Sequence, residues 1–552
     1  MLEYQDIQLG SAEPVDSDAA VTPNSLHHRS RISSFSNVSL GSSEIDYDDQ
    51  PMDSSDAKQG LNTWRLAALT FFTVSGGPYG LEPLVSKIGP FYSIIGLLVV
   101  PWIWGLPSAL MTAELASALP EMGGYILWVE RSMGDFWAFQ NAIWNLFTNV
   151  LDNSLYPVMF TDYLEQMVGH DFSYFTRSAI GITLVSALGL VNVVGVDIVG
   201  DGAGAFGCFV IMPFILMVIV GFASGEVDPE DWSKRIDEPQ VGLYVSMLLW
   251  NTCGYDSAGT CAAEVENPGK TFPRAMVATI IVSTLLYILP LMVGVSFATD
   301  YELWEDGLFV EIGDLVGGFW LKLLVLVAGT VSSAGQLNST ICTSSRALAC
   351  MAGFGYVPRR LSRIHPKYGT PLMAIFINSS SIILMVLTGL DFESIAELSM
   401  WLYSLTLGFE FAALILLRVN EPDLKRPYVI PGGTLGVCLL SMPPLICCAI
   451  LMTLSQTRTW YLCSFVVLAG GVLLVPFYSF SGRPVQLPSW LSWLIRTFGC
   501  YVFRRLDNTL SEDTQVHSTE DEAEIELSSA SLDPVTAEAE RVRFDVDTIK
   551  YI

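Results

Sequence analysis

Charged residues are scarce in this chain. They make up 15% of its 552 residues, whereas 51% are hydrophobic, and the mean hydropathy is +0.45. A soluble globular protein carries about 25% charged residues. The apolar residues also fall in runs of roughly 20, each long enough to cross the ~30 Å hydrocarbon core of a bilayer. The composition excludes a soluble enzyme and predicts an all-α polytopic membrane protein that has the lipid bilayer as its surroundings.

Histidine is absent from the apolar runs, and cysteine is absent from the predicted outer loops. None of the five histidines lies in an apolar run; they are His27, His28, His170, His365 and His517. None of the ten cysteines lies in a loop that we predict to face outward, which argues against a disulfide framework. No run carries a histidine cluster or a nucleophile beside a base. We therefore expect no metal, no cofactor and no enzymatic activity.

The apolar runs predict about twelve transmembrane helices, which together form a core over residues 61–480. We place them near residues 62–88, 91–113, 135–165, 176–194, 198–223, 241–266, 274–298, 316–350, 371–389, 393–418, 435–454 and 459–480. No apolar stretch precedes the first run, so we expect no cleaved signal peptide.

The segments outside this core have a different composition. Residues 1–60 and 507–552 are rich in Ser, Asp and Glu, and we expect both to be disordered acidic tails because they offer little apolar surface to bury. Residues 481–506 place tryptophan and other aromatic residues beside arginine. That mixture is typical of an amphipathic juxtamembrane helix lying on the membrane surface.

Basic residues in short loops predict the orientation. The loops after the sixth, eighth and tenth predicted spans all fall on one side and carry Lys270, Arg274, Arg359, Arg360, Arg363, Lys367, Arg418, Lys425 and Arg426. This side should be cytosolic, with both termini on it. Loops 224–240 and 299–315 on the opposite side are acidic and would concentrate cations, although acidity also serves simple solubility. We expect the plasma membrane, with an internal vesicle membrane as the alternative.

Two of the predicted spans are broken in the middle by residues that loosen a helix. Residues 75–80 read SGGPYG, and residues 251–259 read NTCGYDSAG. Unpaired backbone groups survive at membrane depth only inside protein or beside a water-filled cavity. Breaks at corresponding positions of two halves indicate the binding site of a secondary transporter. We therefore predict that spans 1–5 and 6–10 form two inverted five-helix repeats with broken helices 1 and 6, followed by two extra helices.

Acidic residues inside spans point to a cationic ligand. Asp256 lies within the second break, and Asp152 belongs to a polar stripe of the third span that also contains Asn141, Asn145, Asn149 and Tyr156. Glu410 shares a helical face with Tyr403 and Thr406. An intramembrane acid is a functional hypothesis because its burial is costly. The alternative for each is an interhelical hydrogen bond or a neutralised acid.

Other features of the breaks agree with a cation. Pro78 removes one backbone donor from the first break, and Glu82 follows it, so an anionic group is less welcome there. Aromatic rings near the acids offer π faces to ammonium groups, although each ring alone is more often core packing; they are Tyr79, Tyr156, Trp250, Tyr255 and Tyr403. Glu264 and Glu266, beside Lys270 and Arg274, are interpreted as a gate or loop ion pair.

Several motifs resemble the amino acid–polyamine–organocation superfamily. They are residues 76–82 (GGPYGLE), 120–125 (PEMGGY), 152–157 (DNSLYP), 250–257 (WNTCGYDS) and 263–268 (AEVENP). Within it, residues 62–480 resemble the polyamine uptake transporters of plants and protozoa. The resemblance implies alternating access and proton-coupled uptake of putrescine and spermidine, with Tyr156, Asn251 and Tyr403 at substrate positions. Related exchangers bind a heavy chain through an outer-loop cysteine; residues 165–176 contain none, so no disulfide-linked partner is expected.

The residues and the resemblance together predict a substrate site made of Gly76, Gly77, Tyr79, Glu82, Asp152, Tyr156, Trp250, Asn251, Tyr255, Asp256, Tyr403 and Glu410. Asp152 and Asp256 would bind separate amines, and Glu82 or Glu410 would carry a coupling proton. We expect no nucleic acid partner. The alternatives are a carrier of cationic or neutral amino acids and a transport-inactive nutrient receptor. Sodium coupling also stays open at this stage.

Overall fold

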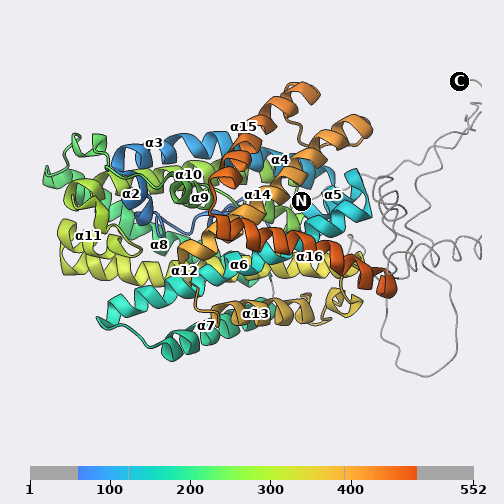
Figure 1. Ribbon diagram of the computed structural model, residues 1–552, viewed down its shortest axis with the longest axis horizontal. Helices are drawn as coiled ribbons and strands as arrows, with labels where there is room; N and C mark the ends of the chain where they lie inside the picture. The colour runs from blue at the N-terminus through green and yellow to red at the C-terminus, as the bar shows by residue number, and fades with distance from the viewer. Residues whose placement is uncertain (1–59, 122, 195, 391, 482–552) are drawn as a thin grey trace, which may run out of the picture. The chain divides into compact units, whose positions relative to one another are not determined.

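The computed structural model describes residues 60–121, 123–194, 196–390 and 392–481 (Figure 1). In these residues the chain forms helices and no β-strand. The α-helices are α1 (Thr63–Val74), α2 (Glu82–Ile88), α3 (Pro90–Val100), α4 (Leu106–Ala118), α5 (Tyr125–Met133), α6 (Asp135–Val168), α7 (Tyr174–Val194), α8 (Val196–Ser224), α9 (Val241–Trp250), α10 (Pro268–Phe297), α11 (Leu308–Gly317), α12 (Phe319–Gly353), α13 (Leu372–Val386), α14 (Phe392–Asn420), α15 (Gly433–Leu454) and α16 (Thr457–Ser481).

Each of the twelve predicted spans overlaps one of these helices or a consecutive pair, except that residues 241–266 comprise α9 and a 3₁₀ helix. Among the described residues, seven helical stretches are both long and apolar enough to cross a membrane: Pro90–Ala118, Tyr174–Val194, Phe206–Ser224, Pro268–Phe297, Phe319–Gly353, Phe392–Asn420 and Gly433–Leu454. The prediction of a polytopic helical membrane protein is confirmed. The predictions for the tails and for the juxtamembrane segment fall almost entirely outside the described residues.

The two broken spans run in opposite directions. The first consists of α1 and α2, and the second consists of α9 and the 3₁₀ helix η4 (Asp256–Glu264). The N–H of Gln240, just before α9, donates to the carbonyl of Lys87 at the end of α2, at 2.7 Å. The N–H of Glu266, just after η4, donates to the carbonyl of Leu61 before α1, at 3.0 Å. Each broken span thus begins where the other ends, as expected for the first elements of two inverted repeats.

Two short helices were not predicted, because nine or ten residues are too few to be detected as a span. α5 lies between α4 and α6, and α11 lies in the stretch that we assigned to an outer loop. α11 is amphipathic: Phe309, Val310 and Ile312 are buried, whereas Leu315 is exposed. Burial of this face holds the loop against the bundle.

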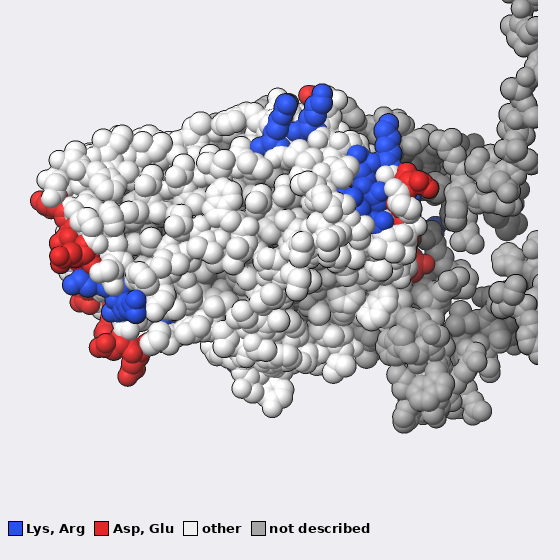
Figure 2. Space-filling view, turned by 90° about the horizontal axis from the view of Figure 1, so that it is seen from above, with Lys and Arg blue, Asp and Glu red and all other residues white. Residues whose placement is uncertain are grey.

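The two ends of the bundle differ in charge. In Figure 2, acidic side chains gather at one end and a group of lysines and arginines stands at the other. We call the end with residues 225–240 and 299–307 the acidic end, and the end with residues 354–371 and 421–432 the basic end.

Buried charges near the basic end are paired. Arg418 donates from Nε to Oε1 of Glu114 at 2.5 Å, and the Nε of Arg346 lies 2.9 Å from Oε1 of Glu264. The sequence interpretation of Glu264 as part of an ion pair is correct, but its partner is Arg346 of α12, not Lys270 or Arg274. Arg346 is nearly fully buried, and the pair fastens η4 to α12.

Candidate functional site

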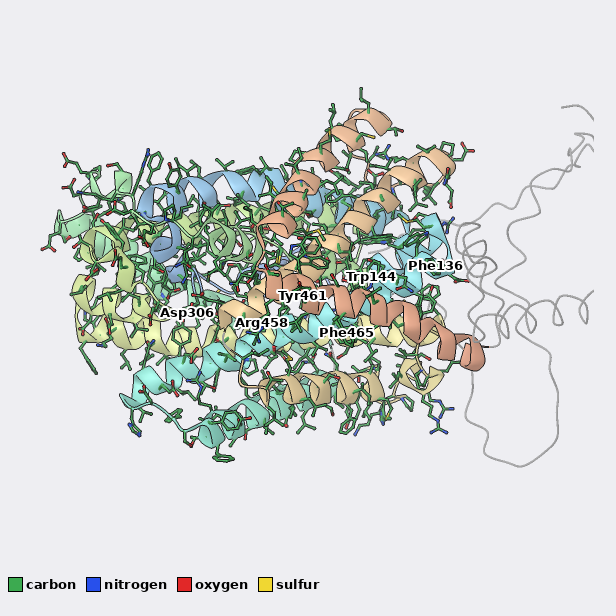
Figure 3. All side chains as sticks on the ribbon, viewed as in Figure 1. Phe136, Trp144, Asp306, Arg458, Tyr461 and Phe465 are labelled. Atoms are coloured by element: carbon green, nitrogen blue, oxygen red, sulfur yellow. The ribbon has the colours of Figure 1, made fainter. Side chains whose placement is uncertain are left out.

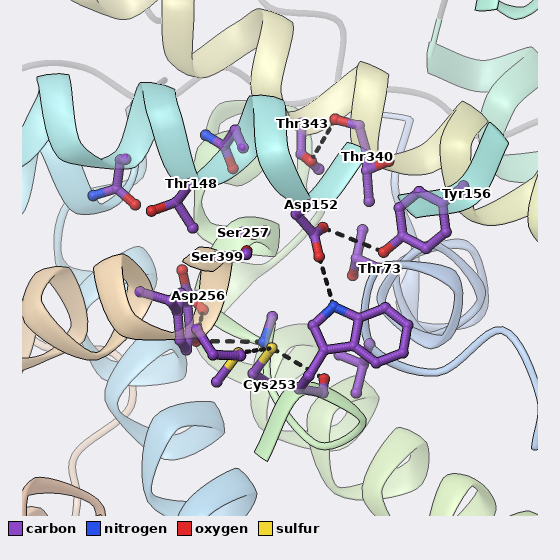
Figure 4. Close-up of a pocket in the computed structure, with 17 residues that line it drawn as sticks. Thr73, Thr148, Asp152, Tyr156, Cys253, Asp256, Ser257, Thr340, Thr343 and Ser399 are labelled. Carbon is purple, nitrogen blue, oxygen red and sulfur yellow. Dashed lines mark hydrogen bonds between the residues drawn. The ribbon is translucent and has the colours of Figure 1, made fainter. Parts of the chain in front are cut away.

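A small cavity lies where the two breaks meet the helices around them (Figure 4). Its volume is about 40 Å³, and its walls come from α1, α6, α9, η4, α12 and α14. The lining residues are Thr73, Val74, Asn145, Thr148, Asn149, Asp152, Tyr156, Trp250, Cys253, Gly254, Asp256, Ser257, Thr340, Thr343, Ser399, Met400 and Tyr403. This lining holds two carboxylates and no lysine, arginine or histidine.

Asp152 projects into the cavity from α6 and is held by two aromatic donors. The indole Nε1 of Trp250 donates to its Oδ1 at 2.8 Å, and the hydroxyl of Tyr156 donates to its Oδ2 at 3.2 Å. Tyr156 lies one turn further along the same helix, whereas Trp250 is the last residue of α9. The second break therefore brings an indole N–H to an acid of the third span. Both donors stabilise the ionised carboxylate.

Asp256 is the first residue of η4 and is almost completely buried. The hydroxyl of Tyr403 on α14 donates to its Oδ1 at 2.5 Å and accepts from the N–H of Gly254 at 3.3 Å. Gly254 has a φ of +93°, a conformation that side chains with a Cβ rarely adopt. The glycine thus permits the sharp turn that aims Asp256 at the cavity.

At the first break, several backbone donors are already engaged by the protein itself. The N–H of Gly77 donates to Oγ of Ser75 at 3.2 Å, and the N–H of Gly80 donates to Oε2 of Glu82 at 2.9 Å. Pro78 has no N–H to offer. The other oxygen of Glu82 accepts from the N–H of Gly307 at 3.2 Å, which ties this break to the loop before α11. Glu82 is therefore a structural anchor with satisfied oxygens in this conformation.

Asn251 links the two breaks and does not line the cavity. Its Nδ2 donates to the carbonyl of Gly80 at 3.1 Å and to the carbonyl of Met247 at 2.9 Å. Its own carbonyl accepts from the hydroxyl of Tyr287 at 3.0 Å. In this conformation Asn251 positions the backbone of both broken helices.

Two predicted aromatic residues lie in packed protein. The hydroxyl of Tyr79 donates to the carbonyl of Val325 at 2.8 Å, and its ring packs edge-on against Tyr163 and Phe214. Tyr255 is buried, and its ring lies so close to Gly105 that a Cβ there would be 3.1 Å from it. The structure gives both side chains a packing role.

The structure thus divides the predicted set. The residues that it brings together around the cavity are Asp152, Tyr156, Trp250, Asp256 and Tyr403. The residues that it leaves outside the lining are Gly76, Gly77, Tyr79, Glu82, Asn251, Tyr255 and Glu410. Gly76 and Gly77 form the break itself, with φ of +59° and +116°. The roles of all twelve in substrate binding stay predictions.

Several lining residues were not identified from the sequence. Thr148 lies one turn before Asp152, and Ser399 lies one turn before Tyr403. Extending each polar stripe by four residues would have found both, because residues four apart share a helical face. Thr340 lies one turn after Gln336 on α12, and Cys253 lies within the second break, so each also carried a local signal.

Comparisons with known proteins agree with this architecture. The family model described as "Amino acid permease" matches residues 61–474. A probable polyamine transporter of Arabidopsis thaliana is 37% identical over 422 residues, covering 75% of this chain and 86% of the relative. The polyamine transporter PUT1 of Oryza sativa is 36% identical over 433 residues, covering 78% and 80%. The human large neutral amino acids transporter small subunit 2 is 25% identical over 369 residues, covering 64% and 66%. This chain belongs to the amino acid permease family of the amino acid–polyamine–organocation superfamily, as its motifs predicted.

Proposed function

We propose that this protein is a secondary active transporter that imports polyamines such as putrescine and spermidine by alternating access, coupled to protons. It resides in the plasma membrane with both termini in the cytosol. The observation that carries the proposal is the central cavity, where Asp152 and Asp256 stand on different helices and no basic side chain is present. Relatives that span most of this chain are named polyamine transporters.

The geometry of the two acids suits a ligand with two positive charges. Each carboxylate is held in place by an aromatic donor, and each oxygen keeps a lone pair free for an ammonium group. Two buried carboxylates that lack a basic neighbour are costly, and a dication removes that cost. The aromatic rings beside the two acids would also attract the ammonium groups of the substrate by cation–π interaction; they are Trp250, Tyr156 and Tyr403.

An amino acid fits less well at the first break. Amino-acid carriers of related architecture bind the substrate carboxylate on the N–H groups exposed by a broken helix. Here the N–H of Gly80 is engaged by the carboxylate of Glu82, and Pro78 has none. A substrate carboxylate would have to displace Glu82 and would then lie next to its negative charge. An amine meets no such competition.

The size of the cavity requires movement. A volume of about 40 Å³ holds only a few water molecules, so a polyamine enters after the walls separate. Hinges for this movement are present at the two breaks, which absorb a change of φ and ψ without unravelling a whole helix. The acids at the acidic end draw cations toward the outer mouth.

Uptake into proteoliposomes tests the proposal. Purified protein should accumulate radiolabelled putrescine when a proton gradient is imposed and should not respond to a sodium gradient. Unlabelled putrescine should compete, whereas arginine and leucine should not. Uptake dominated by leucine or arginine would establish an amino-acid carrier instead. Binding without accumulation would establish a receptor, and uptake driven by sodium would overturn the proton coupling alone.

A further inference from the structure

A third buried acid lies near the cavity but outside its lining. Glu410 on α14 is 0% exposed, and neither of its carboxyl oxygens has a hydrogen-bond partner among the described residues. It lies seven residues beyond Tyr403, so the helical repeat places both residues on the same face, with Glu410 on the side of the basic end. A carboxyl group with two unsatisfied oxygens in a packed interior is an uncommon arrangement.

The groups around Glu410 leave its charge uncompensated. Asp256 of η4 is the titratable side chain whose charge acts on Glu410, and the charge of Glu410 would in turn act on Tyr125 of α5, Tyr403 of α14 and Cys448 of α15. All four are neutral or negative, and no basic group of the described chain is among them. An ionised carboxylate here would face Asp256 without a donor, so this conformation disfavours the ionised form of Glu410.

Two polar side chains near Glu410 also belong to the cavity or contact its lining. Asn149 lines the cavity and donates from Nδ2 to the hydroxyl of Tyr125 at 3.0 Å, and Tyr125 is one of the neighbours of Glu410. On the other side, Tyr403 contacts Asp256 directly. Asn141, two turns before Asn149 on α6, also has both amide atoms buried without a partner in the described chain. Unsatisfied polar atoms therefore occur on both α6 and α14, which pack against each other.

We propose that Glu410 is the proton-binding site of this carrier and that its protonation permits the cavity to contract. The proton comes from water on one side of the membrane and bonds to a carboxylate oxygen of Glu410. It leaves to water on the other side once the packing of α14 opens. Protonation removes the repulsion from Asp256 and the cost of a bare charge, so α5, α6 and α14 close around a neutral acid. This inference rests on the proposed transport function and selects Glu410, not Glu82, because the oxygens of Glu82 are satisfied by the N–H groups of Gly80 and Gly307.

The first test separates exchange from accumulation. Glu410→Gln keeps a neutral side chain of the same shape, so putrescine counterflow between equal concentrations should persist. Its pH profile should become flat, whereas wild-type counterflow should decline at alkaline pH. Accumulation driven by a proton gradient should fall at least 10-fold. Unchanged accumulation with a wild-type pH profile would overturn the proposal.

Glu397 supplies a matched control. It lies on the same helix and is nearly fully buried, but its Oε1 accepts from the N–H of Gln456 at 2.7 Å. Glu397→Gln should retain both the pH profile and the accumulation. Equal losses in the two variants would show that any buried acid of α14 has this effect, which would contradict a specific role for Glu410.

Infrared difference spectroscopy tests the protonation directly. Wild-type protein at neutral pH should show a component of the carbonyl stretch of protonated carboxylic acids that is lost in Glu410→Gln and persists in Glu397→Gln. Glu410→Leu gives the same assignment if the glutamine variant folds poorly. Equal intensity of this band in the wild type and in Glu410→Gln would refute the proposal. This arm needs no transport, so a failure of putrescine uptake in the wild-type protein would count against the proposed function alone.

Discussion

The hydroxyl of Tyr403 bonds both to the carboxylate of Asp256 and to the backbone N–H of Gly254, at 2.5 and 3.3 Å. One side chain of α14 thus holds an acid of the cavity and the turn that presents it. Movement of α14 against the second break must disturb both bonds together. If Asp256 binds substrate as proposed, this contact couples substrate binding to the packing of the bundle.

Removing this hydroxyl should weaken substrate binding. Tyr403→Phe deletes a hydrogen bond to a charged group, which is worth about 1.5–3 kcal/mol. The KM for putrescine should rise by about 10- to 100-fold. Tyr461 of α16 is 74% exposed, and Tyr461→Phe is the control that should leave the KM unchanged (Figure 3). Similar KM values for the two variants would contradict the role of Tyr403.

Trp250→Phe should act on the other acid. It removes the indole N–H that bonds to Oδ1 of Asp152, but a phenyl ring can keep the edge-on packing against Phe392. The KM for putrescine should rise about 10-fold, as measured by uptake against substrate concentration. Trp401→Phe is the matched control, because its buried Nε1 has no hydrogen-bond partner among the described residues. A larger KM effect from Trp401 than from Trp250 would refute this assignment.

The first break should not tolerate a side chain. At Gly76, φ is +59°, and an added Cβ would lie 2.3 Å from Cδ of Gln336. Gly76→Ala should therefore abolish putrescine uptake. Gly134→Ala separates strain from collision, since Gly134 has φ of +83° but nothing within 4 Å of an added Cβ. Gly134→Ala should keep most of the uptake. A loss of uptake in both variants would show that backbone strain, and not collision with Gln336, causes the effect.

A double-mutant cycle should measure a large coupling energy between the buried residues Glu264 and Arg346. Removing one partner leaves an unpaired buried charge, which costs about 3–5 kcal/mol. Glu264→Leu or Arg346→Met alone should lower the Tm of the detergent-solubilised protein strongly, and the double variant should recover much of the loss. Lys322→Met breaks a half-exposed pair with Asp314 and should change the Tm little. Additive losses in the double variant would exclude the coupling.

Asp306 should make stability depend on pH. It lies in the loop before α11, toward the acidic end (Figure 3), and its Oδ1 is buried without a partner in the described chain. Burial raises the pKa of this carboxyl well above its ordinary value, and the nearby Glu82 adds to the shift. Its folded-state pKa exceeds the unfolded value of 3.8, so folding favours the protonated form. The stabilisation that this carboxyl contributes is therefore complete below pH 3.8 and is lost as the pH rises through the folded-state pKa.

Asp306→Asn should remove the loss of stability that the wild type shows as the pH rises. The Tm of the variant should exceed that of the wild type at neutral and alkaline pH and match it at the acid end of the range. Asp300→Asn, at an exposed position near the same loop, is the control and should follow the wild-type curve. A wild-type curve that runs parallel to that of Asp306→Asn would show that the carboxyl does not titrate in this range.

The sequence predicted the course of the chain well because membrane spans leave a local signal. All twelve spans are recognisable from runs of apolar residues; glycine marks both broken spans, and proline marks the first. The short helices α5 and α11 were not predicted because their stability depends on packing one face against helices that are distant in the sequence. α11, for example, buries Phe309 and Ile312 only when the bundle exists.

The candidate site was predictable only where chemistry and periodicity agreed. Asp152 and Tyr156 are one turn apart on α6, so a single helical wheel identifies both. Tyr79 has the same residue type and a similar depth, yet it packs against Tyr163 and Phe214, which no local pattern indicates. The partner of Glu264 is 82 residues away in the chain, and pairing at that distance is a property of the fold.

The bridge from Gly80 through Glu82 to Gly307 has a pharmacological consequence. Because one carboxylate fastens the loop before α11 to the backbone beside the cavity, restraint applied at the surface is transmitted to the first break. A nanobody that clamps residues 301–317 would arrest the carrier as a non-competitive inhibitor. Raising the substrate concentration would not relieve the inhibition, since the nanobody would not compete with substrate for the cavity.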